Sequence, residues 1–197
     1  MGRTVEFFFD FGSPASYLAH TQLPGIAARA GATLVCRPML LGGVFKATGN
    51  ASPVTIAAKG RWMAADLARF AARYGVPLRM PPNFPVNTLA MMRGAVGMQM
   101  RRPADFARYA TAMFDAMFAR GLDMADPAVF AGALAGAGFD VAAFQALVAD
   151  PEVKQGLVAA TEEAVARGVF GAPTMFVGDE MHFGQDRLDF VAAALAR

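Results

Sequence analysis

The chain has 197 residues, 55% of them hydrophobic and 17% charged, and a formal net charge of +2. This length suits one domain, or one domain with a large insertion, and the apolar share is sufficient for a sizeable core. The small net charge, without a basic stripe, argues against a nucleic-acid partner. No apolar run reaches the roughly 18 residues of a membrane span. The mean hydropathy of +0.35 favours a surface covered by a second subunit.

The N-terminus and the cysteine content indicate a compartment. The apolar run Val5–Phe9 ends at Asp10 without a small-residue cleavage site, so we do not expect a signal peptide. The single cysteine, Cys36, forms no internal disulfide and lies in a strand-like run, where a packed thiol is expected. Both features predict a protein of the reducing cytoplasm.

The first forty residues predict a strand, a helix and a second strand. Residues 4–10 predict the first strand, and Ser13-Pro14 then provides an N-cap and a proline at the first helical position. The apolar spacing predicts a helix as far as Ala30, which Pro24 should bend or break. Residues 33–37 predict the second strand, so the two strands should be parallel and joined by a right-handed crossover.

The middle of the chain predicts helices alone. A loop rich in Gly, Asn and Ser is expected over residues 40–53, and strand signals are almost absent from residue 55 to residue 167. The apolar spacing and the capping residues indicate a series of helices instead. Their expected ranges are 61–74, 88–100, 103–120, 127–135, 141–149 and 151–167.

The end of the chain returns to strands. Residues 174–177 and 180–183 are typical of two strands joined by the tight turn Gly178-Asp179. A final helix is expected from residue 184 to residue 195. The predicted order is therefore β-α-β, a helical insertion, and β-β-α, with Pro173 directly before the third strand.

This layout resembles the thioredoxin fold, and the inserted helices make it similar to the DsbA-like branch of that fold. The resemblance implies an α/β protein in which residues 1–53 and 151–197 are the thioredoxin-like parts and residues 54–150 the all-helical insertion. Pro173 would then be the family's cis-proline beside the active site. Disulfide oxidoreductases of this fold need Cys-x-x-Cys, but this chain has Gly12-Ser13-Pro14-Ala15. Thiol–disulfide exchange through the protein's own sulfurs is therefore excluded.

Five groups of short motifs narrow the resemblance. They are Asp10-Phe11-x-Ser13-Pro14-x-x-Tyr17-Leu18, Lys46 with Gly49-Asn50, Lys59 with Asp66-Leu67, Val169-Phe170-Gly171-x-Pro173-Thr174-Met175-Phe176, and Gly178-Asp179-Glu180-Met181 with Phe183-Gly184-x-Asp186-Arg187-Leu188. Their order and spacing resemble those of 2-hydroxychromene-2-carboxylate isomerases and kappa-class glutathione transferases, and the C-terminal half leans toward the isomerase. The chain departs from the pattern at Phe84, where Tyr is frequent, and at Ala172, where a larger aliphatic residue is frequent.

The resemblance implies glutathione as the source of the missing sulfur. Ser13 would donate a hydrogen bond to its thiolate, and the positive end of the helix would favour the ionised thiol. Judged by its spacing alone, Ser13 is better explained as a plain N-cap, worth about 1 kcal/mol, and only the resemblance favours the thiolate role.

The remaining glutathione contacts are implied at the end of the chain. The backbone of Ala172, beside Pro173, would pair with the cysteinyl part of glutathione. Its γ-glutamyl end would lie at the start of the last helix, where Asp186 would pair with the ammonium group. The alternative is that Asp186 only caps that helix. The residues implied there are Phe183, Gly184, Gln185 and Asp186.

A small aromatic carboxylate is the implied substrate. Lys46 and Asn50 would hold its oxygens and Phe84 would wall its ring, although Lys46 as a solvated cation and Asn50 as a turn residue are equally consistent with the sequence. Trp62 could wall the ring too, but an aromatic residue at helical spacing is more often core, and we expect Trp62 there.

The resemblance implies a glutathione-dependent isomerase. It would interconvert 2-hydroxychromene-2-carboxylate and trans-o-hydroxybenzylidenepyruvate by reversible thiolate addition, in naphthalene-type aromatic catabolism. A kappa-class-like glutathione transferase and a non-catalytic thioredoxin-like binding module are the alternatives. No metal is implied, and His20 and His182 are expected to be structural or surface residues. A homodimer is expected.

Overall fold

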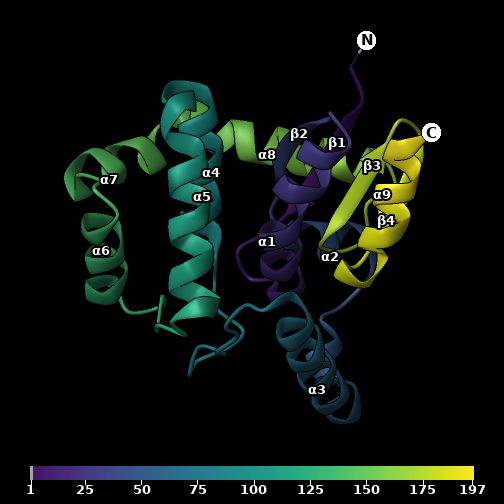
Figure 1. The fold of residues 1–197 in the computed structure, drawn as a ribbon. Coiled ribbons are helices and arrows are strands. Elements are labelled where there is room, and N and C mark those ends of the chain that lie inside the picture. The colour runs from purple at the N-terminus through teal and green to yellow at the C-terminus, as the bar shows by residue number, and fades with distance from the viewer. Residues whose placement is uncertain (1) are drawn as a thin grey trace.

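The structure, a computed structural model, describes residues 2–197 and contains a four-stranded sheet in the order β2-β1-β3-β4 (Figure 1). Strands β1 and β2 are parallel, whereas β3 runs antiparallel to both β1 and β4. The strands are β1 (Thr4–Phe9), β2 (Thr33–Pro38), β3 (Thr174–Val177) and β4 (Glu180–Phe183). The predicted β-α-β and β-β-α units are confirmed, and they meet where β1 pairs with β3.

Helices cover both faces of this sheet because the side chains of β1 alternate. Phe7 and Phe9 belong to the large core that contains α1 (Pro14–Arg29) and α9 (Leu188–Ala196). Phe8 points to the other face, in a smaller core with residues of α2 (Leu41–Thr48) and α8 (Pro151–Ala166). The apolar run that opens the chain is therefore buried on two sides.

The helical part extends the large core away from the sheet (Figure 1). Its aromatic residues continue those of β1: the ring centroid of Phe114 lies 5.6 Å from that of Phe9 and 4.8 Å from that of Phe11. The helices are α3 (Ala57–Tyr74), α4 (Leu89–Arg101), α5 (Phe106–Phe114), α6 (Pro127–Gly136) and α7 (Val141–Ala149). A π-helical turn at Asp115–Ala119 extends α5, and 3-10 turns lie at Pro53–Thr55, Pro103–Asp105 and Gln185–Arg187.

Several predictions of secondary structure are wrong in part. Residues 41–48 form the helix α2 within the segment expected to be a loop. The helix α1 runs unbroken through Pro24. The single helix expected over residues 103–120 is divided into a 3-10 turn, α5 and the π-helical turn.

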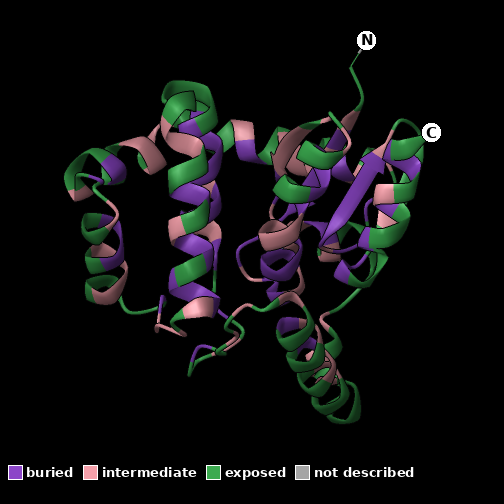
Figure 2. Cartoon of the chain, in the orientation of Figure 1, coloured by how far each residue is buried: buried purple, intermediate pink, exposed green. Residues whose placement is uncertain are grey.

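Trp62 is a further correction. It was expected in the core, but it is 63% exposed on α3, a helix that projects from the body and is largely exposed (Figure 2). Helical spacing distinguishes the faces of a helix, but it does not say how much of the helix is covered. Only Leu67 and Ala71 of α3 are buried.

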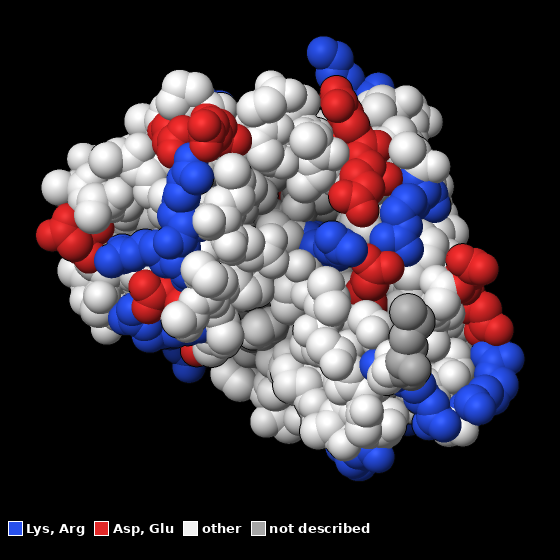
Figure 3. Space-filling view, turned by 90° about the horizontal axis from the view of Figure 1, so that it is seen from above, with Lys and Arg blue, Asp and Glu red and all other residues white. Residues whose placement is uncertain are grey.

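Charged residues of both signs are interspersed on the surface, with wide uncharged areas between them (Figure 3). Within residues 2–197, no single helix is both long and apolar enough to cross a membrane. The helices α6 and α7 reach that length and hydropathy only as a pair, and the chain bends by 113° between them.

Candidate functional site

Ser13 lies at the corner between β1 and α1, and its hydroxyl has two partners. Its oxygen accepts a hydrogen bond from the Ser16 backbone N–H at 3.0 Å, which caps α1. Its proton is donated to the carbonyl of Ala172, also at 3.0 Å. Ser13 is only 5% exposed. The predicted N-cap is therefore confirmed, and the same hydroxyl links residues 159 positions apart.

The segment opposite Ser13 is held by the end of the sheet. The Ala172–Pro173 peptide bond is cis, and the Pro173 carbonyl accepts a hydrogen bond from the Gly184 N–H at 3.0 Å. The ring centroids of Phe170 and Phe183 are 4.6 Å apart. Gly171 permits this contact, since a Cβ there would lie 2.8 Å from the Phe183 ring. The segments 170–173 and 183–184 therefore form one wall beside the hydroxyl.

This wall and the Ser13 corner border the cavity of the site, which has a volume of about 750 Å³. That volume falls in the range of about 300–1,000 Å³ that is usual for small-molecule sites. Residues near both ends of the chain line it together with residues of α2 and α3. Of the residues predicted for the site, those that line the cavity are Ser13, Asn50, Phe84, Ala172, Pro173, Phe183, Gly184, Gln185 and Asp186.

Helix α3 supplies a wall of the cavity, although Trp62 was expected in the core and Lys59 was given no role. Lys59 and Arg61 bring two exposed cations to the cavity, and the exposed Trp62 lies beside them. Lys59 belongs to one of the matching motifs and Trp62 was considered as a wall of the ring, whereas for Arg61 the spacing on an amphipathic helix was the available signal. The cavity thus has an aromatic wall and positive charge on the same helix, which suits an aromatic anion.

The start of the last helix contributes both a buried and a charged group. Gln185 is 7% exposed, and its carbonyl accepts a hydrogen bond from the Tyr74 hydroxyl at 2.8 Å. Asp186 forms an ion pair with the neighbouring Arg187 at 2.7 Å. An ammonium group bound there would therefore compete with the Arg187 guanidinium for the Asp186 carboxylate, or share that carboxylate with it.

Asn50 lies where it can position the cavity wall. Its side-chain amide donates a hydrogen bond to the Phe170 carbonyl at 2.8 Å, and its oxygen accepts one from the Ala51 N–H at 2.8 Å. Asn50 therefore connects the segment after α2 with the segment before Pro173. This role was not among those considered for it.

Lys46 is not brought to this site. It is exposed and lines a second cavity of about 660 Å³ between α2, α4 and α8, which also contains Arg93 and Lys154. Lys46 and Asn50 are close in sequence, but Lys46 lies within α2 and lines the second cavity, whereas Asn50 follows α2 and lines the Ser13 cavity. The position of Lys46 gives no support to a contact with a substrate in the Ser13 cavity.

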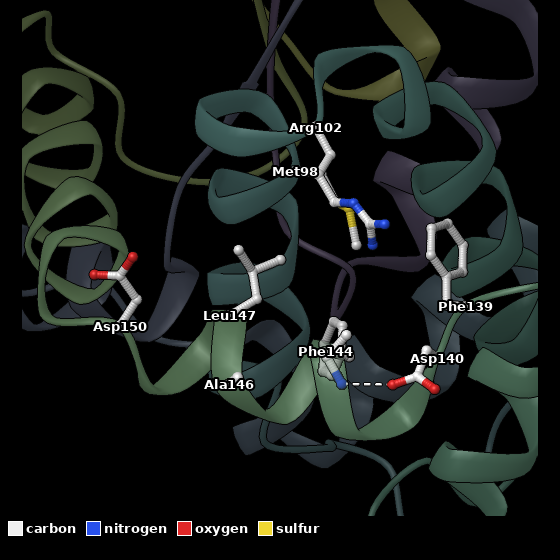
Figure 4. Close-up of a pocket in the computed structure, with 9 residues that line it drawn as sticks. Met98, Arg102, Phe139, Asp140, Phe144, Ala146, Leu147 and Asp150 are labelled. Carbon is white, nitrogen blue, oxygen red and sulfur yellow. Dashed lines mark hydrogen bonds between the residues drawn. The ribbon is translucent and has the colours of Figure 1, made fainter.

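A smaller cavity of about 320 Å³ lies between α4 and α7 and shares no lining residue with the Ser13 cavity (Figure 4). Its polar groups already have partners. Asp140 accepts a hydrogen bond from the Ala143 N–H at 2.6 Å, and Asp150 caps α8 at the Glu152 N–H while it also pairs with Arg101. These groups serve helix capping, so this cavity offers little to a polar ligand.

Other titratable residues do not form a second reactive centre. Burial raises the pKa of the Cys36 thiol to about 11, which makes it a poor nucleophile near neutral pH. Burial lowers the pKa of His20 to about 4, and its ring contacts Thr111 at 3.3 Å. Within residues 2–197, no three His, Cys, Asp or Glu side chains form a group suited to a metal ion.

Asp10 is a site residue to which the sequence assigned no role. It is 1% exposed, and its carboxylate accepts hydrogen bonds from the Gly12 N–H, the Leu41 N–H and the Thr88 hydroxyl. Burial raises its pKa, although these three hydrogen bonds oppose that shift. Asp10 opens the matching segment Asp10-Phe11-x-Ser13-Pro14, and this is the sequence signal that could have drawn attention to it.

Comparisons with known proteins agree with this geometry. Residues 4–196 match the DsbA-like thioredoxin domain family. The chain is 35% identical to a 2-hydroxychromene-2-carboxylate isomerase of Sphingobium xenophagum over 99% of both chains. It is 30% identical to human glutathione S-transferase kappa 1, over 98% of this chain and 91% of that protein.

A solved structure extends the comparison to three dimensions. A 2-hydroxychromene-2-carboxylate isomerase superposes with a TM-score of 0.87 at 34% identity, covering 98% of this chain and 95% of that one. The similarity therefore includes both thioredoxin-like parts and all the inserted helices. The chain belongs to the DsbA-like thioredoxin family, within the 2-hydroxychromene-2-carboxylate isomerase family that is related to the kappa-class glutathione transferases.

Proposed function

We propose that this protein is a glutathione-dependent isomerase. It would interconvert 2-hydroxychromene-2-carboxylate and trans-o-hydroxybenzylidenepyruvate in the breakdown of aromatic compounds. One observation carries the proposal: the Ser13 hydroxyl, at the positive end of a 16-residue helix, lies 3.0 Å from the Ala172 carbonyl in a cavity of about 750 Å³. The names of the related isomerases support the choice of reaction.

The residues present fit glutathione. A hydroxyl donor and a helix N-terminus stabilise a thiolate, and Ala172 offers its backbone beside a cis-proline for the peptide. The Asp186 carboxylate, which lines the same cavity, can pair with the ammonium group. When bound, glutathione would supply a thiolate that adds to the conjugated double bond and later leaves, so that the bond can rotate between the two steps.

The chain's own groups would orient the reactants. The Ser13 proton must turn from the Ala172 carbonyl toward the sulfur, which a hydroxyl can do by rotating about its C–O bond. The cap from the Ser16 N–H is kept during this rotation, because it uses the oxygen rather than the proton. We propose that Lys59 or Arg61 holds the carboxylate of the substrate and that Trp62 and Phe84 contact its ring.

The decisive experiment tests Ser13 and turnover together. Ser13→Ala should raise the pKa of the bound glutathione thiol by about one unit or more and lower kcat about tenfold or more, since hydrogen bonds to charged groups are worth about 1.5–3 kcal/mol. Thiolate absorbance and the isomerase rate measure the two effects. Ser52→Ala removes another hydroxyl from the same cavity and should leave both near wild type. An unchanged thiol pKa in Ser13→Ala would leave Ser13 as a helix cap alone.

A transferase is the second candidate, favoured by the 30% identity to the human kappa-class enzyme. The two functions differ in whether glutathione is consumed. Many turnovers of the chromene carboxylate with catalytic glutathione, and no loss of the free thiol, would support the isomerase. Stoichiometric loss would support the transferase, and no binding at millimolar glutathione would favour the non-catalytic module.

We also propose that two copies of the chain associate. The support is the set of large apolar side chains on the surface, among them Phe190 at 57% exposed, Val158 at 46% and Met181 at 42%.

A further inference from the structure

The carboxylate of Asp10 is a buried junction between parts of the chain that are distant in sequence. Its Oδ1 accepts from the Gly12 N–H at 2.7 Å and from the Thr88 hydroxyl at 2.7 Å, and its Oδ2 accepts from the Leu41 N–H at 2.8 Å. The side chain is almost fully buried. All three donors are uncharged, so the carboxylate is held by aligned dipoles and not by an ion pair.

Each of these donors stands at the beginning of a helix. Gly12 is two residues before α1, Leu41 is the first residue of α2, and Thr88 directly precedes α4. A helix N-terminus carries partial positive charge from its unpaired N–H groups. Three such ends therefore converge on one acid, which stabilises its ionised form and fixes the three helices relative to one another.

The junction also fixes the corner that carries Ser13. The Asp10 side chain holds the Gly12 N–H, and the Asp10 carbonyl accepts from the Ser13 N–H at 3.0 Å. Little space remains around Gly12, because a Cβ there would lie 3.2 Å from the Thr88 Cγ2 and 3.3 Å from the Asp10 Oδ1. The start of α1 is thus clamped between Asp10 and Thr88.

The same carboxylate holds the α2 side of the cavity. Leu41, bound through its N–H, and Phe45, one turn later on α2, both line the Ser13 cavity. A change at Asp10 would therefore reach the Ser13 hydroxyl and the opposite wall at once, although Asp10 itself does not line the cavity.

We propose that Asp10 is a positioning residue, which sets the direction of the Ser13 hydroxyl and the placement of α2 along the cavity. The inference rests on the proposed function for its kinetic consequences. It also predicts the direction in which the pKa of the bound thiol changes when Asp10 is replaced, and a purely electrostatic effect would have the opposite direction. A nearby negative charge by itself disfavours a thiolate, so its removal would lower the pKa of the bound thiol. Loss of positioning would raise that pKa, because the thiolate would lose its contact with Ser13.

The test begins with Asp10→Asn, which removes the charge and puts an amide NH₂ where one acceptor oxygen stood. Either the Gly12 or the Leu41 N–H then faces a donor. We expect kcat to fall tenfold or more, the KM for glutathione to change less than threefold, and the pKa of the bound thiol to rise. A thiol pKa that falls or stays unchanged, with kcat near wild type, would overturn the proposal.

Thr88 provides a second pair of variants that keeps the proposal testable if Asp10→Asn does not fold. Thr88→Val removes the hydroxyl at nearly constant shape, whereas Thr88→Ser keeps it. We expect Thr88→Val to shift kcat and the thiol pKa in the same direction as Asp10→Asn but less, and Thr88→Ser to restore both. Equal behaviour of Val and Ser at this position would contradict the proposal.

Tyr109→Phe is the control for a general loss of stability. Tyr109 is fully buried, and its hydroxyl donates to the Met91 carbonyl at 2.8 Å within the helical part. Its removal costs a buried hydrogen bond in which no residue that lines the Ser13 cavity takes part, and the ring keeps its contact with Phe11. We expect a lower stability with an unchanged thiol pKa.

Hydrogen exchange separates this inference from the proposed function, because it needs no glutathione. In Asp10→Asn, the amides of Gly12, Ser13 and Leu41 should exchange faster than in the wild type by tenfold or more, after correction for global stability. If those rates do not change, the anchoring role of Asp10 fails even in a protein that binds glutathione. If the rates rise and the wild type binds no glutathione, the proposed function fails and the anchoring role stands.

Discussion

The Ser13 hydroxyl caps a helix and also faces the cavity, so its removal has two separable effects. Loss of the cap costs about 1 kcal/mol of stability in any buffer. Loss of the donor removes the hydrogen bond to the Ala172 carbonyl and, with glutathione bound, changes the chemistry of its thiol. Any kinetic comparison of Ser13 variants is therefore made well below the temperature at which the capped helix begins to unfold.

His20 should make the stability of the protein depend on pH. Burial lowers its folded pKa from 6.5 to about 4. As pH falls below 6.5, the unfolded chain binds the proton first, so the folded state loses stability until pH approaches 4. Because the ring is partly exposed, we expect a loss on the order of 1 kcal/mol between pH 6.5 and pH 5.

His20→Gln removes this titration and keeps a polar side chain next to Thr111. Urea unfolding of both proteins at pH 7 and pH 5 measures the effect. The variant should gain stability relative to the wild type as pH falls. A constant difference between the two proteins at both pH values would show that His20 does not contribute.

At the scale of elements, the prediction of α2 as a loop shows what the sequence hides. Gly42 and Gly43 weaken a helix by propensity, but contacts with distant residues outweigh this. Gly43 lies so close to α8 that a Cβ would be 3.0 Å from the Thr161 Cγ2, and the Thr161 hydroxyl accepts from the Leu40 N–H. The glycine that appeared to break the helix is what lets α2 approach α8.

The boundaries of α7, β3 and β4 were predicted correctly, because each is set by local signals. Asp140 caps α7 through the Ala143 N–H, and Gly178, with φ of 58°, makes the turn between β3 and β4. The face that α3 presents could not be predicted in this way, since it depends on what the rest of the chain leaves uncovered.

A pair of glycine substitutions should separate packing from propensity. In α4, a Cβ at Gly94 would meet the Tyr109 hydroxyl and lie 2.6 Å from the Phe144 ring. Gly94→Ala should therefore destabilise the protein by about 1–3 kcal/mol through overpacking. In α6, Gly132 is exposed with no atom within 4 Å of a Cβ, so Gly132→Ala should stabilise by about 0.5–1 kcal/mol.

Chemical denaturation of the two alanine variants provides the measurement. If both variants were stabilised, that result would contradict the close packing of Gly94 against Tyr109 and Phe144. The two changes in unfolding free energy are expected to have opposite signs because Gly94 is tightly packed and Gly132 is exposed, whereas the substitution is the same.

For the whole molecule, the order of strands and helices was sufficient to predict the fold. The strand–helix–strand opening and the return to strands after the helices are what predicted the sheet. The assembly of the cavity was only partly predictable. Ser13 and Ala172 could be joined through the family resemblance, whereas Trp62 and Lys46 had to be placed by the packing of helices. Helix packing depends on shape across distant segments, and periodicity in one segment does not encode it.

Trp62 has an optical consequence. It is the single tryptophan of the chain, it is 63% exposed, and it lines the cavity. The indole emission of the native protein should therefore lie at the long wavelengths of a hydrated ring, and complete unfolding in urea should shift it little. A small aromatic carboxylate that fills the cavity displaces that water, so the emission should move to shorter wavelength or be quenched, in proportion to occupancy. A large red shift on unfolding would contradict the exposed position. Tryptophan fluorescence will then measure binding in this protein, while circular dichroism is needed to follow its folding.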